Sequence, residues 1–393
     1  MDIKLKESGL PKFIQDKLDF HYKDIIESTK NGKHLVLGER PKTGDIFLQS
    51  NDYLSLSNNS EIINAQVDSL LSMKESPVMS GVFLQDGESK PKIEVDLASF
   101  TGFDNCLILQ SGWSANMSLL QTICTENTNI YIDFFTHMSL WEGARVVGAK
   151  IHPFMHNNMR HLERSVKRHG PGIIIVDSIY STLGTIAPIA DIVEIAKTYN
   201  CATIVDESHS LGTHGHHGAG IVESLGLSKH VDFLTASLAK SFAFRAGAVW
   251  SNNSTNSLLP FLAYPTIFSS ALLPNELDRI AKTLEVIKYQ DQAREKLQSN
   301  ARYVVAKLRQ IGFTIKSESQ IIGLETGDER NTEKVRDFLE FHGVFGAIFC
   351  RPATPDNKNI MRLSLHSALS TEEIEHILRV CKMAYDQSDL YFL

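Results

Sequence analysis

The sequence predicts an α/β protein, with a large domain on a mainly parallel seven-stranded sheet and a smaller α+β domain after it. Between about residues 104 and 250, short apolar runs alternate with helical segments, which indicates parallel strands with helices on both sides. Some runs, such as 173–176 (IIIV), are continuously apolar, as in a strand covered on both faces. The seven expected strands are 106–110, 130–132, 150–154, 173–176, 202–205, 231–235 and 246–250.

Helical patterns lie between and around these strands. Residues 187–200 carry apolar side chains along one side only, as expected for a helix packed on a sheet. The segment 10–26 is predicted to form an amphipathic N-terminal helix. Residues 275–310 predict one long helix that ends near Gly312.

The C-terminal part predicts a small sheet with its own helices. A helix after the first strand should end at Gly343, and Ser370 with Glu373 fits a capping box that opens the final helix. The expected strands are 321–325, 345–350 and 360–365. We therefore divide the chain into a helical N-terminal arm (1–45), a large domain (46–275) and a small α+β domain (276–393).

Charge and composition exclude several classes of protein. With 39 Lys and Arg against 46 Asp and Glu, the formal net charge of the 393 residues is −7, whereas nucleic-acid and membrane-surface binders usually present a basic face. The 5 cysteines are widely spaced, which indicates a reducing compartment without a disulfide framework. No apolar run approaches the ~20 residues that cross a bilayer. We expect a cytoplasmic protein with no nucleic-acid partner, no membrane partner and no metal site.

Two residues that follow strands of the large domain are candidates for chemistry. Asp206 comes directly after the strand 202–205, at the sheet edge where open α/β folds bind ligands; alone, it could equally cap a helix. Lys240 stands among small and apolar residues, where burial would lower its pKa and make it a nucleophile for carbonyl groups; alone, it could be a surface lysine. Together they suggest a pyridine cofactor held by the lysine, with its ring nitrogen paired to the aspartate.

Weaker candidates follow other strands. Ser111, Gly112 and Trp113 begin a helix whose amides could hold a phosphate group. Ser237 could add a hydroxyl donor, and His137 could stack on an aromatic cofactor. A strand–Ser–Gly–helix turn and a lone histidine are also common in purely structural positions.

Two arginines are candidates for binding a carboxylate, because a planar guanidinium can bind it through two hydrogen bonds. Arg351 stands in a constrained segment at the end of a strand, next to Pro352. Arg362 lies in the strand 360–365, where a surface position is the default. Arg351 is therefore the better candidate.

The chain resembles the α-oxoamine synthases, fold-type I pyridoxal-phosphate (PLP) enzymes of the aspartate aminotransferase-like fold. These enzymes join an amino acid to an acyl-CoA. The resemblance covers nearly the whole chain and is most specific to the CqsA-type quorum-sensing autoinducer synthases of vibrios, through 133–145, 176–188 and 320–340. The ordered family motifs are SNDYLSL (50–56), SGWSANM (111–117), TH (136–137), DSIYSTLGTIAP (177–188), DESHSLGTHG (206–215), TASLAKSF (235–242), IFSSALLP (267–274) and RPATP (351–355).

This resemblance implies roles for individual residues. Lys240 would carry the cofactor covalently and later move the α-carbon proton, while Asp206 would pair with the pyridine nitrogen. His209 would hydrogen-bond the phenolic oxygen of the cofactor, and His137 would stack on its ring. Further cofactor contacts would be Ser111, Gly112, Trp113, Ser181 and Ser237, joined by Ser269 and Ser270 of the partner subunit in an obligate homodimer.

The resemblance also implies a reaction. A medium-chain acyl-CoA of about eight to ten carbons would condense with S-adenosylmethionine or (S)-2-aminobutyrate, with loss of CO₂. The product would be an aminoketone or enaminone precursor of an α-hydroxyketone autoinducer. Asn51 and Arg351 would bind the substrate carboxylate. The activities of 8-amino-7-oxononanoate synthase and of 2-amino-3-ketobutyrate CoA ligase are alternatives within the family.

Rival hypotheses come from other classes of protein. A catalytically inactive structural subunit is one, although the presence of both the lysine and the aspartate argues against it. A nicotinamide-dependent oxidoreductase is disfavoured, because no G-x-G-x-x-G follows a strand. A metal-dependent hydrolase remains a remote alternative, with a ligand cluster drawn from Asp206, His209, His214, His216 and His217.

Overall fold

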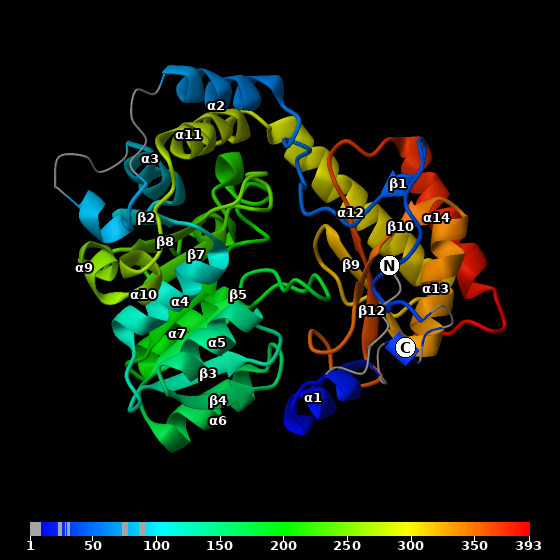
Figure 1. Cartoon of the computed structure of the whole chain (residues 1–393), viewed down its shortest axis with the longest axis horizontal. Helices are drawn as coiled ribbons and strands as arrows, with labels where there is room; N and C mark the ends of the chain where they lie inside the picture. Colours follow the sequence, from blue (N-terminus) through cyan, green and yellow to red (C-terminus); the bar gives the residue numbers. More distant parts are fainter. Residues whose placement is uncertain (1–8, 23–25, 28, 30–31, 73–77, 86–91) are drawn as a thin grey trace.

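The large sheet contains the seven strands that the sequence predicts (Figure 1). The structure, a computed structural model, describes residues 9–22, 26–27, 29, 32–72, 78–85 and 92–393. The strand order is β2-β8-β7-β6-β5-β3-β4. Strand β8 runs antiparallel to both β2 and β7, and the other neighbouring pairs are parallel. The strands are β2 (Asn105–Leu109), β3 (Asn129–Asp133), β4 (Lys150–Phe154), β5 (Ile173–Asp177), β6 (Ala202–Asp206), β7 (Phe233–Ser237) and β8 (Gly247–Ser251).

Helices cover both faces of this sheet, which explains the continuously apolar strand β5. Ile174 and Val176 pack into the core on one face, and Ile173 and Ile175 into the core on the other. Because neither face meets water, the alternation of polar and apolar residues disappears. The helices of this part are α3 (Lys92–Thr101), α4 (Gly112–Ile123), α5 (Met138–Val146), α6 (Met159–His169), α7 (Ile189–Thr198), α8 (Ile221–Ser224), α9 (Thr255–Leu262) and α10 (Tyr264–Ile267), with 3₁₀ helices at Gly81–Leu84 and His216–Gly218.

The C-terminal part has a three-stranded antiparallel sheet, β11-β12-β9. The single strand expected at 345–350 is wrong, because β10 and β11 lie on either side of Gly346 and join different sheets. A side chain at Gly346 would collide with Met361 and Leu363, so the backbone passes close to β12 there. The elements are β9 (Ile321–Gly327), α13 (Glu329–Phe341), β10 (Val344–Phe345), β11 (Ala347–Phe349), β12 (Asn359–Ser364) and α14 (Thr371–Tyr385), which opens with the expected capping box.

The single helix expected over 275–310 is also wrong. Two helices occupy this segment, α11 (Pro274–Lys288) and α12 (Asp291–Ile311). They pack on different partners, α11 on α2 (Ser60–Ser72) and α12 on α14 (Figure 1). The break is stabilised by the Arg294 guanidinium, which donates a hydrogen bond to the Ile287 carbonyl in the last turn of α11 (2.7 Å).

The N-terminal segment reaches the C-terminal part before it enters the large sheet. Helix α1 (Lys12–Tyr22) occupies most of the helix expected at 10–26, of which 23–25 lie outside the described residues. The short strand β1 (Ile46–Phe47) then pairs in parallel with β10. The domain limits at 45/46 and 275/276 stay predictions.

A search of the described ranges for membrane-spanning helices finds none that is both long and apolar enough. Within the described residues, the 5 cysteines form no disulfide.

Candidate active site

A small cavity of about 70 Å³ lies where β6 and β7 end, beside the first turn of α4. Seven of the residues that the sequence proposes for the cofactor line it, together with Asn116, Ser139, Asp177 and Ser208. A hollow of about 440 Å³ between the N-terminal segment and α13 shares none of these residues. The seven are Gly112, Trp113, His137, Asp206, His209, Ser237 and Lys240.

Asp206 ends β6, and its side chain is buried. Asn116 Nδ2 donates to its Oδ2 (2.9 Å), and the Ser208 amide donates to its Oδ1 (2.9 Å). No helix begins at Asp206, so the alternative of a helix cap is wrong. A buried carboxylate with both oxygens already oriented is well prepared to accept one more proton or N–H group.

A second buried carboxyl, Asp177, stands next to Asp206 in the strand register. Burial, and then the charge of Asp206, raise the pKa of Asp177 well above its usual value. Both of its oxygens lie 3.2 Å from the His137 amide, which donates to them. Asp177 therefore acts as a protonated group that fixes the backbone of the His137 turn.

His137 caps the amino end of α5. Its Nδ1 lies 2.8 Å from Ser139 Oγ, and Asn116 Nδ2 donates to the same hydroxyl oxygen (2.9 Å). Burial, and then the charge of Lys240, lower the pKa of His137 below its usual value, although Asp206 opposes this. The lowered pKa favours a neutral imidazole, and the ring lines the cavity where it could stack on a cofactor.

Lys240 follows β7 and lines the same cavity as Asp206. Burial lowers the pKa of its amine first, the charge of Arg362 lowers it further, and Asp206 raises it. A lowered pKa leaves more of the amine unprotonated and nucleophilic. The alternative of a fully exposed surface lysine is wrong, because the side chain is half-buried.

His209 is buried opposite Tyr53, a residue that the sequence argument did not single out. The Tyr53 hydroxyl lies 2.6 Å from His209 Nδ1. Burial lowers the pKa of His209 well below its usual value, and burial raises the pKa of Tyr53. The phenol therefore keeps its proton, and its hydroxyl donates to Asn51 Oδ1 (3.2 Å) while it lies beside the His209 ring.

Arg362 corrects the expectation of a surface arginine, because only 4% of it is exposed. Its guanidinium donates to the Asn51 side-chain oxygen (2.9 Å) and to the Ser181 carbonyl (2.9 Å). Its Nε is buried without a hydrogen-bond partner among the described residues. Arg351 is instead paired with Asp356 (3.1 Å) and is more exposed; its role in binding substrate stays a prediction.

The amino end of α4 has the form of a phosphate site. Ser111 caps it by accepting from the Ser114 amide (3.0 Å). A side chain on Gly112 would come within 2.5 Å of Ser237 Cβ, so only glycine lets the helix end approach β7 this closely. Ser208 Oγ accepts from the Ser237 amide (2.7 Å) and positions that strand end.

Ser269 and Ser270 do not line the cavity of their own chain. Both are exposed, and Ser270 forms a bridge with Ser80. Their expected contact with the partner subunit's cofactor therefore stays a prediction. Ser181 approaches the site through its carbonyl, which accepts from Arg362.

The histidines of the metal-hydrolase alternative do not form one cluster: the ring centres of His216 and His217 lie 3.8 Å apart, but the others have separate partners. His209 faces Tyr53, His214 lies 3.2 Å from Gln298 Nε2, and His217 lies 3.2 Å from an Asp291 oxygen. Within the described ranges, no three His, Cys, Asp or Glu side chains form a group that could hold a metal ion.

The cavity residues fit PLP. The cavity offers an amine of lowered pKa, a buried carboxylate, a neutral imidazole and the amino end of a helix, the four groups that the aldehyde, ring nitrogen, ring face and phosphate of the cofactor require. The close approach of Gly112 to β7 leaves the helix amides accessible to an anion.

Comparison with known proteins agrees with this site. Residues 43–380 match the family model for aminotransferases of class I and II. The chain belongs to this family. The CAI-1 autoinducer synthase of Vibrio campbellii is 54% identical over 392 residues and 100% of both proteins. The 8-amino-7-oxononanoate synthase of Petrotoga mobilis is 29% identical over 335 residues, 84% of this chain and 85% of that protein.

The fold is that of fold-type I PLP enzymes. The structure of Sphingomonas wittichii serine palmitoyltransferase superimposes with a TM-score of 0.81 at 23% identity, covering 94% of this chain and 96% of that one. The resemblance to α-oxoamine synthases is thereby confirmed. The chain is a PLP-dependent acyltransferase.

Proposed function

We propose that this enzyme condenses a medium-chain acyl-CoA of about eight to ten carbons with S-adenosylmethionine or (S)-2-aminobutyrate. Loss of CO₂ would give an aminoketone or enaminone precursor of an α-hydroxyketone quorum-sensing autoinducer. The observation that carries this proposal is the 54% identity to a CAI-1 autoinducer synthase over the full length of both proteins. The reaction would take place in the cytoplasm, where acyl-CoA is available.

The cofactor, when bound, supplies an electron sink for the α-carbon of the amino acid. Asp206 would hold the proton of the pyridine nitrogen, since its carboxylate is fixed by Asn116 and the Ser208 amide. His209 would hydrogen-bond the phenolic oxygen. Lys240 would hold the cofactor through its amine, whose lowered pKa also suits it to move the α-proton of the substrate.

The amino-acid carboxylate would be bound by Arg362 and Asn51. Arg362 keeps an unpartnered buried Nε, and its charge acts on both Lys240 and His209, so it stands close to the reacting amine. A second arginine, Arg351, is the one expected from the family motif RPATP. Both contribute in this proposal, and their variants are compared below.

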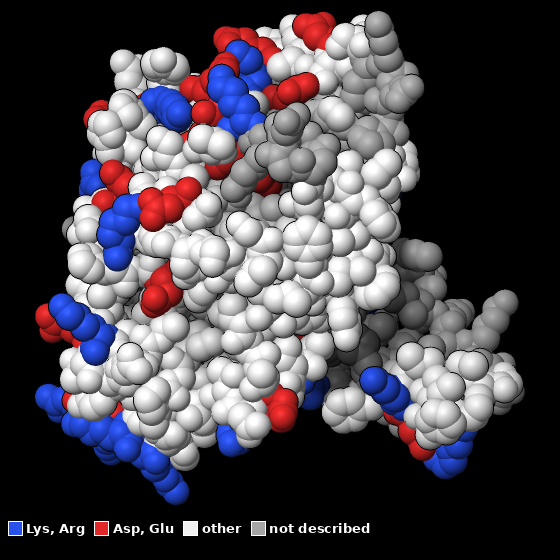
Figure 2. Space-filling model, turned by 90° about the vertical axis from the view of Figure 1, so that its left-hand side faces the viewer, with Lys and Arg blue, Asp and Glu red and all other residues white. Residues whose placement is uncertain are grey.

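A homodimer would complete the site. Figure 2 shows a broad face with few charged side chains, on the side where Figure 1 has α4, α9 and α10. Its exposed apolar side chains lie together instead of being scattered singly, which is typical of an interaction surface. Ser269 and Ser270 follow the last of these residues directly in the chain. A second copy packed there would bring these serines to the partner's cofactor. The side chains are Phe83, Leu258, Phe261, Leu262, Tyr264 and Phe268.

The decisive experiment combines acyl-CoAs of graded length with each candidate amino acid and identifies the products by mass spectrometry. A decarboxylated aminoketone or enaminone from a medium-chain donor is expected. The panel includes the substrates of 8-amino-7-oxononanoate synthase and of 2-amino-3-ketobutyrate CoA ligase; preferred turnover of those would contradict the proposal.

Alanine substitutions at two lysines, one in the cavity and one on the surface, serve as the test and its control. Lys240→Ala should lower turnover by ~10³-fold or more and abolish the cofactor mass that borohydride fixes to the protein. Lys229→Ala, which removes a surface lysine paired with Asp104, should change neither.

A further inference from the structure

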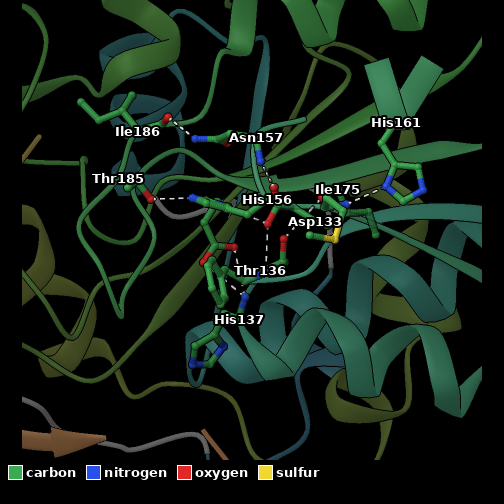
Figure 3. Close-up of polar contacts among 12 residues, drawn as sticks. Asp133, Thr136, His137, His156, Asn157, His161, Ile175, Thr185 and Ile186 are labelled. Atoms are coloured by element: carbon green, nitrogen blue, oxygen red, sulfur yellow. Dashed lines mark hydrogen bonds and ion pairs between the residues drawn. The ribbon is translucent and has the colours of Figure 1, made fainter. Parts of the chain in front are cut away.

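A buried hydrogen-bond relay lies beside the active site without touching the cavity (Figure 3). Asp133, fully buried at the end of β3, accepts from His156 Nδ1 (3.0 Å) and from the Asn157 amide (2.8 Å). With this proton on Nδ1, His156 Nε2 accepts from the Thr185 hydroxyl (2.8 Å). The order Asp–His–Thr is that of a hydrolytic triad, but Thr185 is itself buried, which favours an anchoring role.

The relay holds the loop between β5 and α7, residues 178–187, which we call the bridging loop. Thr185 belongs to it, and Asn157 Nδ2 adds a hydrogen bond to the Ile186 carbonyl (2.8 Å). The His156 ring also packs edge-on against Tyr180 of the same loop, with ring centres 4.4 Å apart. Two successive residues, His156 and Asn157, thus fix the loop to the end of β3.

The opposite side of the bridging loop contacts the C-terminal part. Arg362 donates to the Ser181 carbonyl (2.9 Å), and Ser319 Oγ donates to the Gly184 carbonyl (2.9 Å). Arg362 then donates to Asn51 with its other terminal nitrogen. The loop therefore connects the strand end that precedes the His137 turn with the arginine that faces the substrate.

The same carboxylate serves both sides of the site. Asp133 Oδ1 also accepts from the Phe135 amide (2.9 Å), in the turn that leads to His137. One buried carboxylate thus holds two separate segments: the turn before His137 directly, and the bridging loop through His156.

We propose that His156 is a positioning residue, which through Thr185 holds the bridging loop so that Arg362 binds the amino-acid carboxylate. The proposal rests on the function proposed above, because it assumes an amino-acid substrate. It adds a residue that contacts neither cofactor nor substrate and that acts on substrate affinity.

The test compares Thr185→Val with Thr185→Ser, and His156→Leu with His156→Gln. Valine and leucine remove the relay hydrogen bonds, whereas serine and glutamine can restore them. His161→Leu is the matched control, because the His161 ring accepts from the Met155 amide near the same turn and, among the described residues, makes no hydrogen bond to the relay. Thr185→Val deletes a single hydroxyl, so it remains informative if His156→Leu does not fold.

The first measurement is the binding of (S)-2-aminobutyrate and of propylamine, the same molecule without its carboxylate, to the cofactor-loaded enzyme by visible absorbance. Thr185→Val and His156→Leu should lower the preference for the amino acid about tenfold, with propylamine affinity unchanged. Thr185→Ser, His156→Gln and His161→Leu should keep the preference of the wild type. A preserved preference in the relay variants, or equal weakening of both ligands, would overturn the proposal.

The second measurement is hydrogen exchange in the bridging loop of the cofactor-free protein. Peptides covering 178–187 should exchange about tenfold faster in Thr185→Val and His156→Leu than in the wild type. Unchanged exchange would also overturn the proposal. If the wild type itself shows no spectral response to any amino acid, the proposed function fails instead, and the exchange result still reports on the relay.

Discussion

Three buried carboxyls stand side by side where β3, β5 and β6 end, and their partners give them different roles. Asp133 accepts hydrogen bonds from two backbone amides and an imidazole. Asp177 keeps its proton, because burial and the neighbouring charge raise its pKa. Asp177 and Asp206 both line the cavity of Lys240, but it is Asp206 whose charge raises the pKa of that lysine. The same chemical group thus stands in three different environments, and in the function proposed above Asp206 is the counter-charge of the cofactor.

Asparagine substitutions separate the last two roles. Asp177→Asn replaces a protonated carboxyl by a neutral isostere that still accepts from the His137 amide, so kcat should fall by less than about threefold. Asp206→Asn removes a charge that is worth about 4 kcal/mol at ~4 Å from a cation, so kcat should fall by ~10²–10³-fold. Steady-state turnover measures both. Equal losses in the two variants would contradict these assignments.

Lysine substitutions distinguish the two arginines. Arg362 is buried with a free Nε, and lysine cannot reproduce its three directed donors. We expect Arg362→Lys to raise the KM for the amino acid about 10–100-fold. Arg351→Lys should raise it less than about fivefold, because lysine can still pair with Asp356. A larger effect at Arg351 would restore it as the main carboxylate contact.

The segment between β6 and α8 shows how a loop becomes rigid. Glu207, fully buried, accepts from the Ile221 and Val222 amides at the start of α8 (2.9 and 2.6 Å). A side chain at Gly220 would overlap with this carboxyl group. The carboxyl next to Asp206 therefore fixes the loop that carries His209.

The stability of this loop should depend on pH. Burial raises the pKa of Glu207 to about 7, whereas the unfolded chain releases this proton near pH 4.3. Between these two pH values the folded state keeps the proton that the unfolded chain has released. The contribution of Glu207 to the free energy of unfolding is therefore complete below about pH 4.3 and is lost as the pH rises through about 7. Glu207→Gln should remove up to ~4 kcal/mol of this pH dependence.

Urea unfolding of the wild type and Glu207→Gln at about pH 5 and pH 8 measures this contribution. All other titrating groups are shared, so only the difference between the two proteins matters. The unfolding free energy of the wild type should fall relative to that of Glu207→Gln as the pH rises. A gap that is the same at both pH values would argue against the shift at Glu207.

The apolar face of the complete molecule leads to a prediction about assembly. Burying a side chain such as Phe268 or Leu262 against a second copy contributes about 1.5–3 kcal/mol each. Aspartate at either position should convert the dimer to a monomer in analytical ultracentrifugation and lower activity at least tenfold. Phe341→Asp, at an equally exposed phenylalanine of α13, is the control and should change neither. A wild-type monomer with full activity would contradict the shared site.

Much of the fold could be predicted because it depends on local patterns. The seven strands follow from short apolar runs between helical segments, and the capping box of α14 from two residues three apart. The errors lie where packing overrides the pattern. The break between α11 and α12 is stabilised by Arg294, and the division at Gly346 follows from the close approach of β12.

The candidate site could be predicted only where its residues directly follow strands. Asp206, Lys240 and His137 do so, and the parallel sheet brings strand ends to one edge. Tyr53, Asn116 and Arg362 could not be found in this way. Each is a common residue in an ordinary helix, strand or loop, and its significance comes from partners that lie 90 to 311 residues away in the chain.

The order of residues along the chain was sufficient to establish the alternation of strands and helices, the lysine and aspartate of the site, and the family to which they belong. These follow from spacing and side-chain chemistry within short segments. Which arginine is buried beside Asn51, which carboxyl has a raised pKa and which histidine hydrogen-bonds Thr185 were fixed by three-dimensional packing. Burial and neighbouring charge decide these properties, and both arise only when distant segments come into contact.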